Sequence, residues 1–217
     1  MTDHTNAGAR SLVLGRVRDI LGARTVDAAT EYGAIAREYQ QSAPLEEAAR
    51  IELFVDRLQH YQVGVYRCER ATLPRTIEQI RVDRDKSRLV IPRDLPREWL
   101  PPGLEAVEDT SLTYPELDRS DGVLTGCSIA IAATGTIVLC HGPIEGRRAL
   151  TLVPDYHLCV VSEEQVVATV PEAIARLVQW KPPLVTTISG PSATADIEMM
   201  RIRGVHGPRT LDVVVVG

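Results

Sequence analysis

The residues best suited to chemistry lie near the end of the chain, in the segment Arg203 to Arg209 (RGVHGPR). Its histidine, His206, stands between Gly204 and Gly207, a setting typical of a loop and not of a core. Free imidazole titrates at about pH 6.5, so this side chain could move a proton or bind a carboxylate. A turn histidine without a role is the alternative. Because the loop can return toward Asp196, we take Asp196 and His206 as the candidate catalytic residues.

A second segment, Ser189 to Thr194 (SGPSAT), lies between a predicted strand and a helix predicted over residues 194–201. Ser192 or Thr194 could cap that helix, and the free amides at its start could bind an anion. Asp196 and Glu198 in the first turn would partly oppose a phosphate, but they could accept hydrogen bonds from a ligand. A capped helix whose acids complement its dipole is an equally good interpretation.

A third segment, Thr134-Gly135-Thr136, precedes an apolar run. Small hydroxyl residues beside glycine let backbone amides approach an anion, although a tight turn between strands is the more frequent outcome. Ligands of open α/β sheets bind at the carboxyl ends of strands, where we expect the three segments to form one pocket for a small carboxylate or phosphate. The candidate ligand-binding residues are Thr134, Gly135, Thr136, Gly190, Ser192, Thr194, Asp196, Glu198, Gly204, His206 and Gly207.

Other polar residues are weaker candidates. His141 and His157 lie beside or within apolar runs, where a hydrogen-bonded core histidine is the usual outcome. Arg147 and Arg148 could clamp a carboxylate or phosphate, or form an exposed basic loop. The sequence contains no Walker loop, no GxGxxG after a strand, no HExxH and no GxSxG. We therefore expect no metal or cofactor bound by this chain, and no complete catalytic constellation is identifiable.

Composition excludes several classes of protein. The chain has 217 residues, 24 basic and 29 acidic side chains and a net charge of −5, which argues against nucleic-acid binding. The segment Gly122 to Ile144 is uncharged and long enough to span a bilayer, but its glycines, hydroxyls and Pro143 favour a buried sheet over a membrane span. Four cysteines without CxxC spacing suggest a reduced, cytoplasmic protein.

Periodicity predicts the elements that must position these loops. We expect a frayed stretch over residues 1–10, then one domain over 11–217, with amphipathic helices over 11–60 and a sheet-containing core over 61–217. Apolar, β-branched runs that alternate with helical segments predict a three-layer α/β/α domain with a mainly parallel sheet. The expected strands are 63–66, 89–91, 121–124, 136–140, 157–161, 184–188 and 211–216, with helices at 74–82, 171–180 and 194–201.

Three stretches of this sequence, taken in order, resemble the lactate-utilisation protein C family (LutC, the LUD domain). They are DGVLTGCSIAIAATGTIVL, LVPDYHLCVV and ISGPSATADIEMMRIRGVHGPRTLDVVVV. The resemblance is dense over residues 121–217 and thinner before them. It implies a fold similar to ribose-5-phosphate isomerase, glucosamine-phosphate deaminase and CoA-transferase. It also implies a role in L-lactate use, beside partner proteins that carry iron–sulfur clusters.

Two positions depart from the family pattern. The family often has an acidic residue at the position of Ala133 and a basic residue at that of Ala193, so this protein makes any ligand or partner contact of those side chains differently or not at all. The leading hypothesis is an accessory or organising subunit of a lactate-oxidising system, with the three loops serving as a ligand pocket or as a docking surface for the iron–sulfur partners. The alternatives are a free-standing enzyme acting on a phosphosugar or CoA-type ligand, suggested by fold analogy, and a metabolite-binding regulator.

Overall fold

The computed structural model describes residues 4–22, 27–194, 202–203 and 207–217. The chain forms two compact units, Met1–Tyr39 and Gln40–Gly217. The first contains two helices, α1 (His4–Leu21) and α2 (Ala28–Ala34). Helix α1 begins at His4 and not at Ser11, so the stretch expected to be frayed is helical from that point. Asp27 caps α2 by accepting hydrogen bonds from the amides of Ala29 and Thr30.

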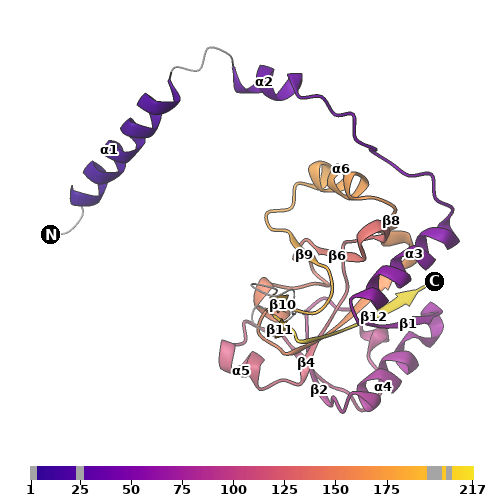
Figure 1. Cartoon of the computed structure of the whole chain (residues 1–217). Coiled ribbons are helices and arrows are strands. Elements are labelled where there is room, and N and C mark those ends of the chain that lie inside the picture. Colours follow the sequence, from indigo (N-terminus) through magenta and orange to yellow (C-terminus); the bar gives the residue numbers. More distant parts are fainter. Residues whose placement is uncertain (1–3, 23–26, 195–201, 204–206) are drawn as a thin grey trace. The chain divides into compact units, whose positions relative to one another are not determined.

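The second unit is built on a six-stranded sheet in which every neighbouring pair is parallel. Its order is β1-β12-β7-β4-β2-β3. Figure 1 labels four of these strands, β1, β12, β4 and β2. The strands are β1 (Gly64–Cys68), β2 (Arg88–Ile91), β3 (Glu105–Glu108), β4 (Gly122–Thr125), β7 (Tyr156–Ser162) and β12 (Thr210–Val216). The continuous runs in β7 and β12 are buried on both faces, as a covered parallel sheet requires.

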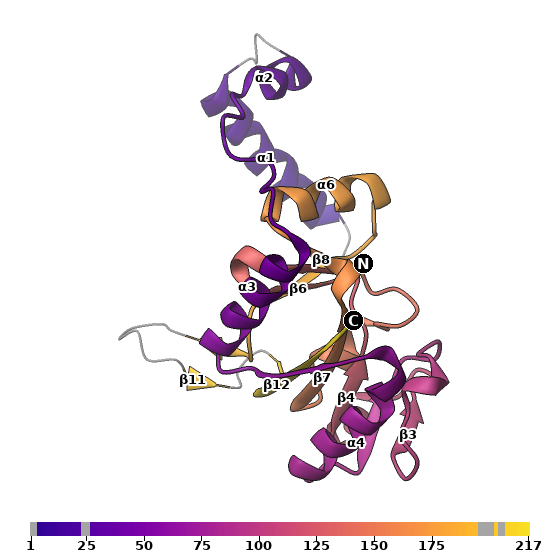
Figure 2. The same cartoon turned by 90° about the vertical axis from the view of Figure 1, so that its right-hand side faces the viewer.

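Helices cover both faces of this sheet. On one face α4 (Leu73–Asp83) packs Leu73, Ile77 and Ile80 against alternate residues of the strands. On the other, α3 (Glu47–His60) buries Phe54 and Leu58. Farther along that face, the short α5 (Tyr114–Asp118) contributes Leu117 to a cluster with strand residues. This arrangement confirms the three-layer α/β/α prediction (Figure 2).

A smaller mixed sheet, in the order β8-β5-β6-β9, adds to the α3 side. Its strands are β8 (Val166–Val167), β5 (Ile129–Ile131), β6 (Thr136–Leu139) and β9 (Thr186–Ile188). Helix α6 (Val170–Trp180) packs Ala173 and Leu177 onto this sheet. The 3-10 turns are η1 (Arg70–Thr72), η2 (Arg97–Trp99), η3 (Ala132–Thr134), η4 (Arg148–Thr151) and η5 (Glu163–Gln165).

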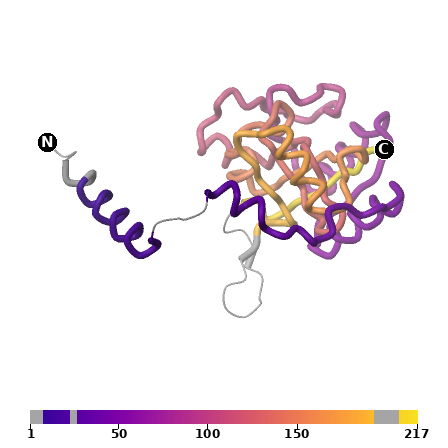
Figure 3. The backbone as a smooth tube through the Cα atoms, turned by 90° about the horizontal axis from the view of Figure 1, so that it is seen from above, coloured from indigo at the N-terminus to yellow at the C-terminus, as the bar shows by residue number. Residues whose placement is uncertain are grey.

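One predicted element starts differently. Thr194, the expected start of a helix, lies in strand β10 (Ala193–Thr194), which pairs antiparallel with β11 (Ile202–Arg203). Thr194 therefore does not begin a helix, and the helix that it was expected to cap falls on residues 195–201, outside the described part of the chain. Figure 3 shows the yellow C-terminal strand running through the body of the unit. Within the described residues, no helix has both the length and the apolar character needed to cross a bilayer.

Candidate functional site

The candidate site is a cavity of about 240 Å³ at the amino ends of β7 and β12. His157 and Leu211, each the second residue of its strand, contribute from the sheet. Strand β9 and the loop after it, residues 186–192, form another wall, and Arg148 with Thr151 closes the site from η4. The expected location, at the carboxyl ends of the strands, applies to residues 189–192 after β9 only, because η4 and residues 207–208 lead into the amino ends of β7 and β12.

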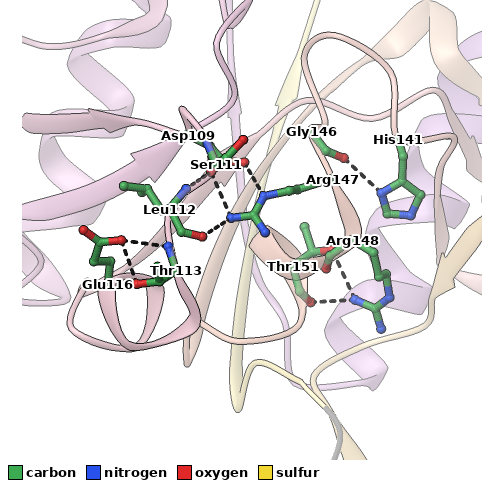
Figure 4. A network of polar contacts seen from close by, with 10 residues as sticks. All are labelled: Asp109, Ser111, Leu112, Thr113, Glu116, His141, Gly146, Arg147, Arg148 and Thr151. Carbon is green, nitrogen blue, oxygen red and sulfur yellow. Dashed lines mark hydrogen bonds and ion pairs between the residues drawn. The ribbon is translucent and has the colours of Figure 1, made fainter.

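Arg148 supplies the cation of the cavity. Its Nη1 donates to the carbonyl oxygen of Thr151 at 3.0 Å and lies 3.2 Å from the Thr151 hydroxyl (Figure 4). Burial lowers the pKa of this guanidinium, with no acidic neighbour contributing. No carboxylate of the described residues forms an ion pair with it. A partly buried guanidinium without a carboxylate partner is suited to binding an anionic ligand.

His157 lines the same cavity and is 1% exposed. Its Nε2 lies 2.8 Å from the hydroxyl oxygen of Thr125, which in turn lies 2.8 Å from the carbonyl oxygen of Gly126. Which of Thr125 and Nε2 is the donor depends on the tautomer of His157.

Further polar side chains, a hydroxyl and two thiols, are buried near His157. The Thr125 hydroxyl also lies 4.0 Å from the sulfur of Cys159, and the thiol of Cys127 lies 3.4 Å from Oε1 of Gln165. The hydrogen bond from Cys127 lowers the pKa of Cys159 against the effect of burial, with His157 and Thr125 acting in the same direction. Both sulfurs are buried, and neither cysteine lines the cavity.

A chain of hydroxyls links two of the predicted segments. Oγ1 of Thr134 lies 2.7 Å from Oγ1 of Thr136, which lies 2.8 Å from Oγ of Ser189. Ser189 and Gly190 line the cavity, whereas Thr134, Gly135 and Thr136 lie behind them. Gly190 has φ +86°, and a Cβ there would lie 2.7 Å from Cβ of Tyr61. The second segment thus forms the cavity wall, and the first supports it.

Gly135, predicted to bind a ligand, contacts helix α3 in the structure. Its φ is +58°, and an added Cβ would lie 2.8 Å from Cβ of Arg57 and 2.9 Å from the carbonyl carbon of Arg57 in α3. This glycine therefore allows the η3 turn to pack closely on a helix. Its amide donates to the carbonyl oxygen of Ala132, and Gly135 is not among the residues that line the cavity.

The third predicted segment reaches the cavity through Gly207 and Pro208. The amide of Ser192, also in the wall, donates to the carbonyl oxygen of Pro208 at 2.9 Å, so the second and third segments lie side by side. The remaining predicted residues, Asp196, Glu198, Gly204 and His206, lie outside the described residues. The proposed Asp196–His206 contact therefore stays a prediction.

The loop between β6 and β7 is held by polar contacts on either side of Arg148 (Figure 4). Arg147 donates to both carboxylate oxygens of Asp109, at 2.7 and 3.0 Å, and to the carbonyl oxygen of Leu112. His141 places Nδ1 3.0 Å from the carbonyl oxygen of Gly146 and Nε2 2.8 Å from the hydroxyl of Thr186. Thr186 itself lines the cavity, so the loop and the cavity wall are joined directly.

Arg148 and His157 were only weak candidates in the sequence, yet both line the cavity. The pair Arg147 and Arg148 suggested either a clamp or an exposed loop, and the structure separates them: Arg147 pairs with Asp109, while Arg148 faces the cavity. His157 is a hydrogen-bonded buried histidine, as expected, but it also lines the cavity. Its position near the start of a buried strand was the one feature of the sequence that could have indicated a place in the cavity. In the described residues, no group of three or more His, Cys, Asp or Glu side chains could hold a metal ion.

Comparison with known proteins places this architecture in a family. Residues 51–216 match the model of the LUD domain. The chain is 45% identical over 183 residues to a protein named lactate utilization protein C from Deinococcus radiodurans, covering 82% of this chain and 85% of that protein. It is 31% identical to a protein of the same name from Shouchella clausii over 113 residues, about half of each chain (50% and 49%).

A solved structure agrees with the fold. A crystal structure of a DUF162 family protein from Deinococcus radiodurans superposes with a TM-score of 0.69 at 41% sequence identity. It covers 80% of this chain and 100% of that one. On these grounds, and on the match of the domain model across the whole sheet-containing core, the chain belongs to the LUD-domain family.

Proposed function

We propose that this protein is an accessory subunit of an L-lactate utilisation system, which oxidises lactate to pyruvate. It acts with partner proteins that carry iron–sulfur clusters, and it holds a small carboxylate or phosphate in the cavity at Arg148. The pathway rests on the relatives named lactate utilization protein C. The ligand rests on one observation, the partly buried Arg148 facing a cavity without a carboxylate partner among the described residues.

The cavity has the features of a small-anion site. A guanidinium offers several N–H donors in a fixed plane, and Arg148 uses only Nη1 for Thr151. Its other donors can meet a carboxylate or phosphate oxygen. Hydroxyls of Thr151 and Ser189 and the backbone after β9 supply further polar groups in the same wall. A volume of about 240 Å³ suits a metabolite of a few carbon atoms, not a dinucleotide.

Ligand-dependent thermal stability tests the anion site. A ligand that binds only the folded protein raises Tm by mass action. We expect L-lactate or pyruvate to raise Tm of the wild type, and Arg148→Gln to abolish the rise. Arg75→Gln is the matched control, because Arg75 is exposed on α4, across the sheet. A response to sugar phosphates or CoA alone would contradict the lactate assignment and favour a free-standing enzyme.

Co-purification tests the partner assignment separately. The full chain, tagged at one end and expressed at native level in its host, is expected to retain proteins with the visible absorption of iron–sulfur clusters. Arg148→Gln should retain them equally if the cavity and the partner surface are separate. Recovery of the tagged chain without any iron–sulfur protein would contradict this part of the proposal.

A further inference from the structure

A second cavity, of about 100 Å³, lies at the carboxyl ends of β7 and β12, the opposite end of these strands from the candidate site. Val160 and Ser162 of β7 and Val216 of β12 line it. The rest of its lining comes from segments that follow strands, namely Arg70, Leu73, Trp99, Ile144 and Gln165. No residue lines both cavities, so the two are separate places on the described part of the chain.

The connections beside the second cavity leave the sheet toward opposite faces. After β1 the chain passes through η1 into α4 on one face, and after β7 it passes through η5 into β8 on the α3 face. Strand β12 lies between β1 and β7, so these two connections diverge on either side of it. Open α/β sheets bind ligands in a crevice of this kind, outside the carboxyl ends of strands whose connections diverge.

The walls of the second cavity are mostly hydrocarbon. Five of its eight lining residues are apolar and pack in one cluster: Leu73, Trp99, Ile144, Val160 and Val216. Gly126 leaves room for two of them, since a Cβ there would lie 2.5 Å from Cδ1 of Ile144 and 3.5 Å from the ring of Trp99. An apolar cavity of about 150 Å³ can hold benzene, so about 100 Å³ suits a chain of roughly three to five carbon atoms.

The amide of Gln165 is already engaged by the backbone around the cavity. Its Oε1 accepts from the amide of Ser162 at 2.8 Å, and its Nε2 donates to the carbonyl oxygen of Cys127 at 2.6 Å. These bonds fix the side chain and use most of its capacity for polar contacts. A ligand in the cavity would therefore meet hydrocarbon and the remaining polar side chain, that of Arg70.

Arg70 is the one charged residue among the described residues that line the second cavity. Its amide donates to the carbonyl oxygen of Gly217 at 3.3 Å, which holds η1 on the end of β12. Its guanidinium is exposed, and no carboxylate of the described residues forms an ion pair with it. Glu163, which begins the turn that carries Gln165, pairs with Arg67 instead. Arg70 is thus available to an anionic group beside an apolar cavity.

We propose that the second cavity binds a short aliphatic carboxylate, with its hydrocarbon chain among the apolar residues and its charge at Arg70. Burial of the chain supplies the hydrophobic part of the binding free energy, and the exposed guanidinium adds a modest electrostatic part. This site is independent of the anion site proposed at Arg148, because the two share no lining residue within the described chain.

Nitrogen-15 spectra of the full chain test this proposal, because the protein has two tryptophans, each with one indole N–H. Trp99 lines the second cavity, whereas Trp180 is 50% exposed on α6 and does not line it. The Trp180→Phe variant assigns the two signals. We expect butyrate to shift the Trp99 signal until it saturates and to leave the Trp180 signal in place. No saturable shift at Trp99, or equal shifts at both indoles, would overturn the proposal.

Two further probes separate the chain from the charge. Butan-1-ol has the hydrocarbon chain without the charge, and inorganic phosphate has the charge without the chain. Each should need about three- to tenfold more ligand than butyrate for half-saturation of the Trp99 shift. Half-saturation by phosphate at the same concentration as butyrate would show an anion site without an apolar component, contrary to the proposal.

Substitutions locate the two parts of the site. Arg70→Gln should raise the half-saturating concentration of butyrate about three- to fivefold and leave that of butan-1-ol unchanged. Arg75→Gln, exposed on α4 and outside the cavity, is the matched control and should change neither. Ile144→Phe fills the cavity and should abolish both responses, with Tm in the absence of ligand showing that the fold is retained. An unchanged butyrate response in Arg70→Gln, or in a folded Ile144→Phe variant, would overturn the assignment.

Arg148→Gln distinguishes this site from the proposed function. It removes the cation of the candidate site and should leave the butyrate shift of Trp99 as it is in the wild type. Loss of that shift in a folded Arg148→Gln variant would show that butyrate acts through the candidate site, which would overturn the second site and leave the first in place.

Discussion

The hydroxyl oxygens of Thr136 and Ser189 lie 2.8 Å apart, although 53 residues separate them in the sequence. Thr136 begins β6 and Ser189 follows β9, its antiparallel neighbour. Ser189 lies in the cavity wall and Thr136 is buried behind it. The contact therefore orients a wall hydroxyl from a position that no ligand touches.

Removing this support should weaken ligand binding more than stability. Thr136→Val preserves shape and deletes the partner of the Ser189 hydroxyl. We expect the anion affinity to fall by about two- to fivefold, since the wall hydroxyl then rotates freely. Thr134→Val, one step farther from the cavity, is the control and should have a smaller effect. Ligand titrations monitored by Tm compare the two, and equal losses would argue against an orienting role for Thr136.

Gly135 should tolerate no side chain. Gly135→Ala places a Cβ 2.8 Å from Cβ of Arg57 at a φ of +58°. We expect a loss of about 1–3 kcal/mol in the free energy of unfolding, from the displaced helix and the left-handed backbone. Gly142→Ala is the matched control, because its nearest neighbour would be 3.8 Å away. Urea denaturation measures both, and a Gly135→Ala variant as stable as the wild type would contradict the packing argument.

The buried carboxylate of Asp212 should depend on one arginine. Both of its oxygens accept from Arg84, at 2.6 and 2.7 Å, and Oδ2 also accepts from the hydroxyl of Tyr156 at 3.0 Å. Arg84→Met leaves this carboxylate without its cation, which should cost about 2–4 kcal/mol, less than a fully enclosed pair because Arg84 is 39% exposed.

The double substitution Arg84→Met, Asp212→Asn supplies the control for that prediction. Without the negative charge the missing cation matters less, so the double variant should be more stable than Arg84→Met alone. A double-mutant cycle from chemical denaturation gives the coupling energy between the two side chains. Additive losses would show that the pair contributes nothing beyond its separate contacts.

Acid should loosen the loop that carries Arg148. Burial raises the pKa of Asp109, but the hydrogen bonds from Arg147, Leu112 and Ser111 outweigh it, and the net shift is downward. A carboxyl whose folded pKa lies below its unfolded value of 3.8 stabilises the fold above that pH. The contribution is lost as pH falls through the lower folded value. Tm should therefore drop between about pH 4 and pH 2, and less steeply in Asp109→Asn. Parallel curves for the two proteins would contradict this role.

Much of the architecture could be predicted from periodicity. The expected strands 89–91, 136–140, 157–161 and 211–216 correspond to β2, β6, β7 and β12 with small shifts at their ends. These segments are buried and rich in β-branched residues, and this composition is typical of strands that are covered on both faces. Strands β3, β5 and β8 were not predicted, because they are short and depend on pairing with distant partners.

The site was predictable in part only. Loop composition indicated Gly190, Ser192 and Gly207, which line the cavity. The position at the amino ends of β7 and β12 could not be predicted. The general preference for carboxyl ends does not say how a long loop returns to the start of a strand. Arg148 and His157 could be identified only from the tertiary structure. The packing of η4 shows that Arg148 lines the cavity and is not a surface residue, and the packing of β7 shows that His157 does more than fill the core.

The position of β12 has a consequence for how the protein is made. Of the six parallel strands it is the last in the chain, yet it lies between β1 and β7. A ribosome releases β1 long before the strand that must pair with it, and β1 and β7 cannot complete the sheet in the meantime. Folding of the core is therefore delayed until synthesis nears residue 216, with the edges of β1 and β7 unpaired until then. Nascent chains of this protein should therefore need protection from aggregation from the release of β1 until β12 has been made.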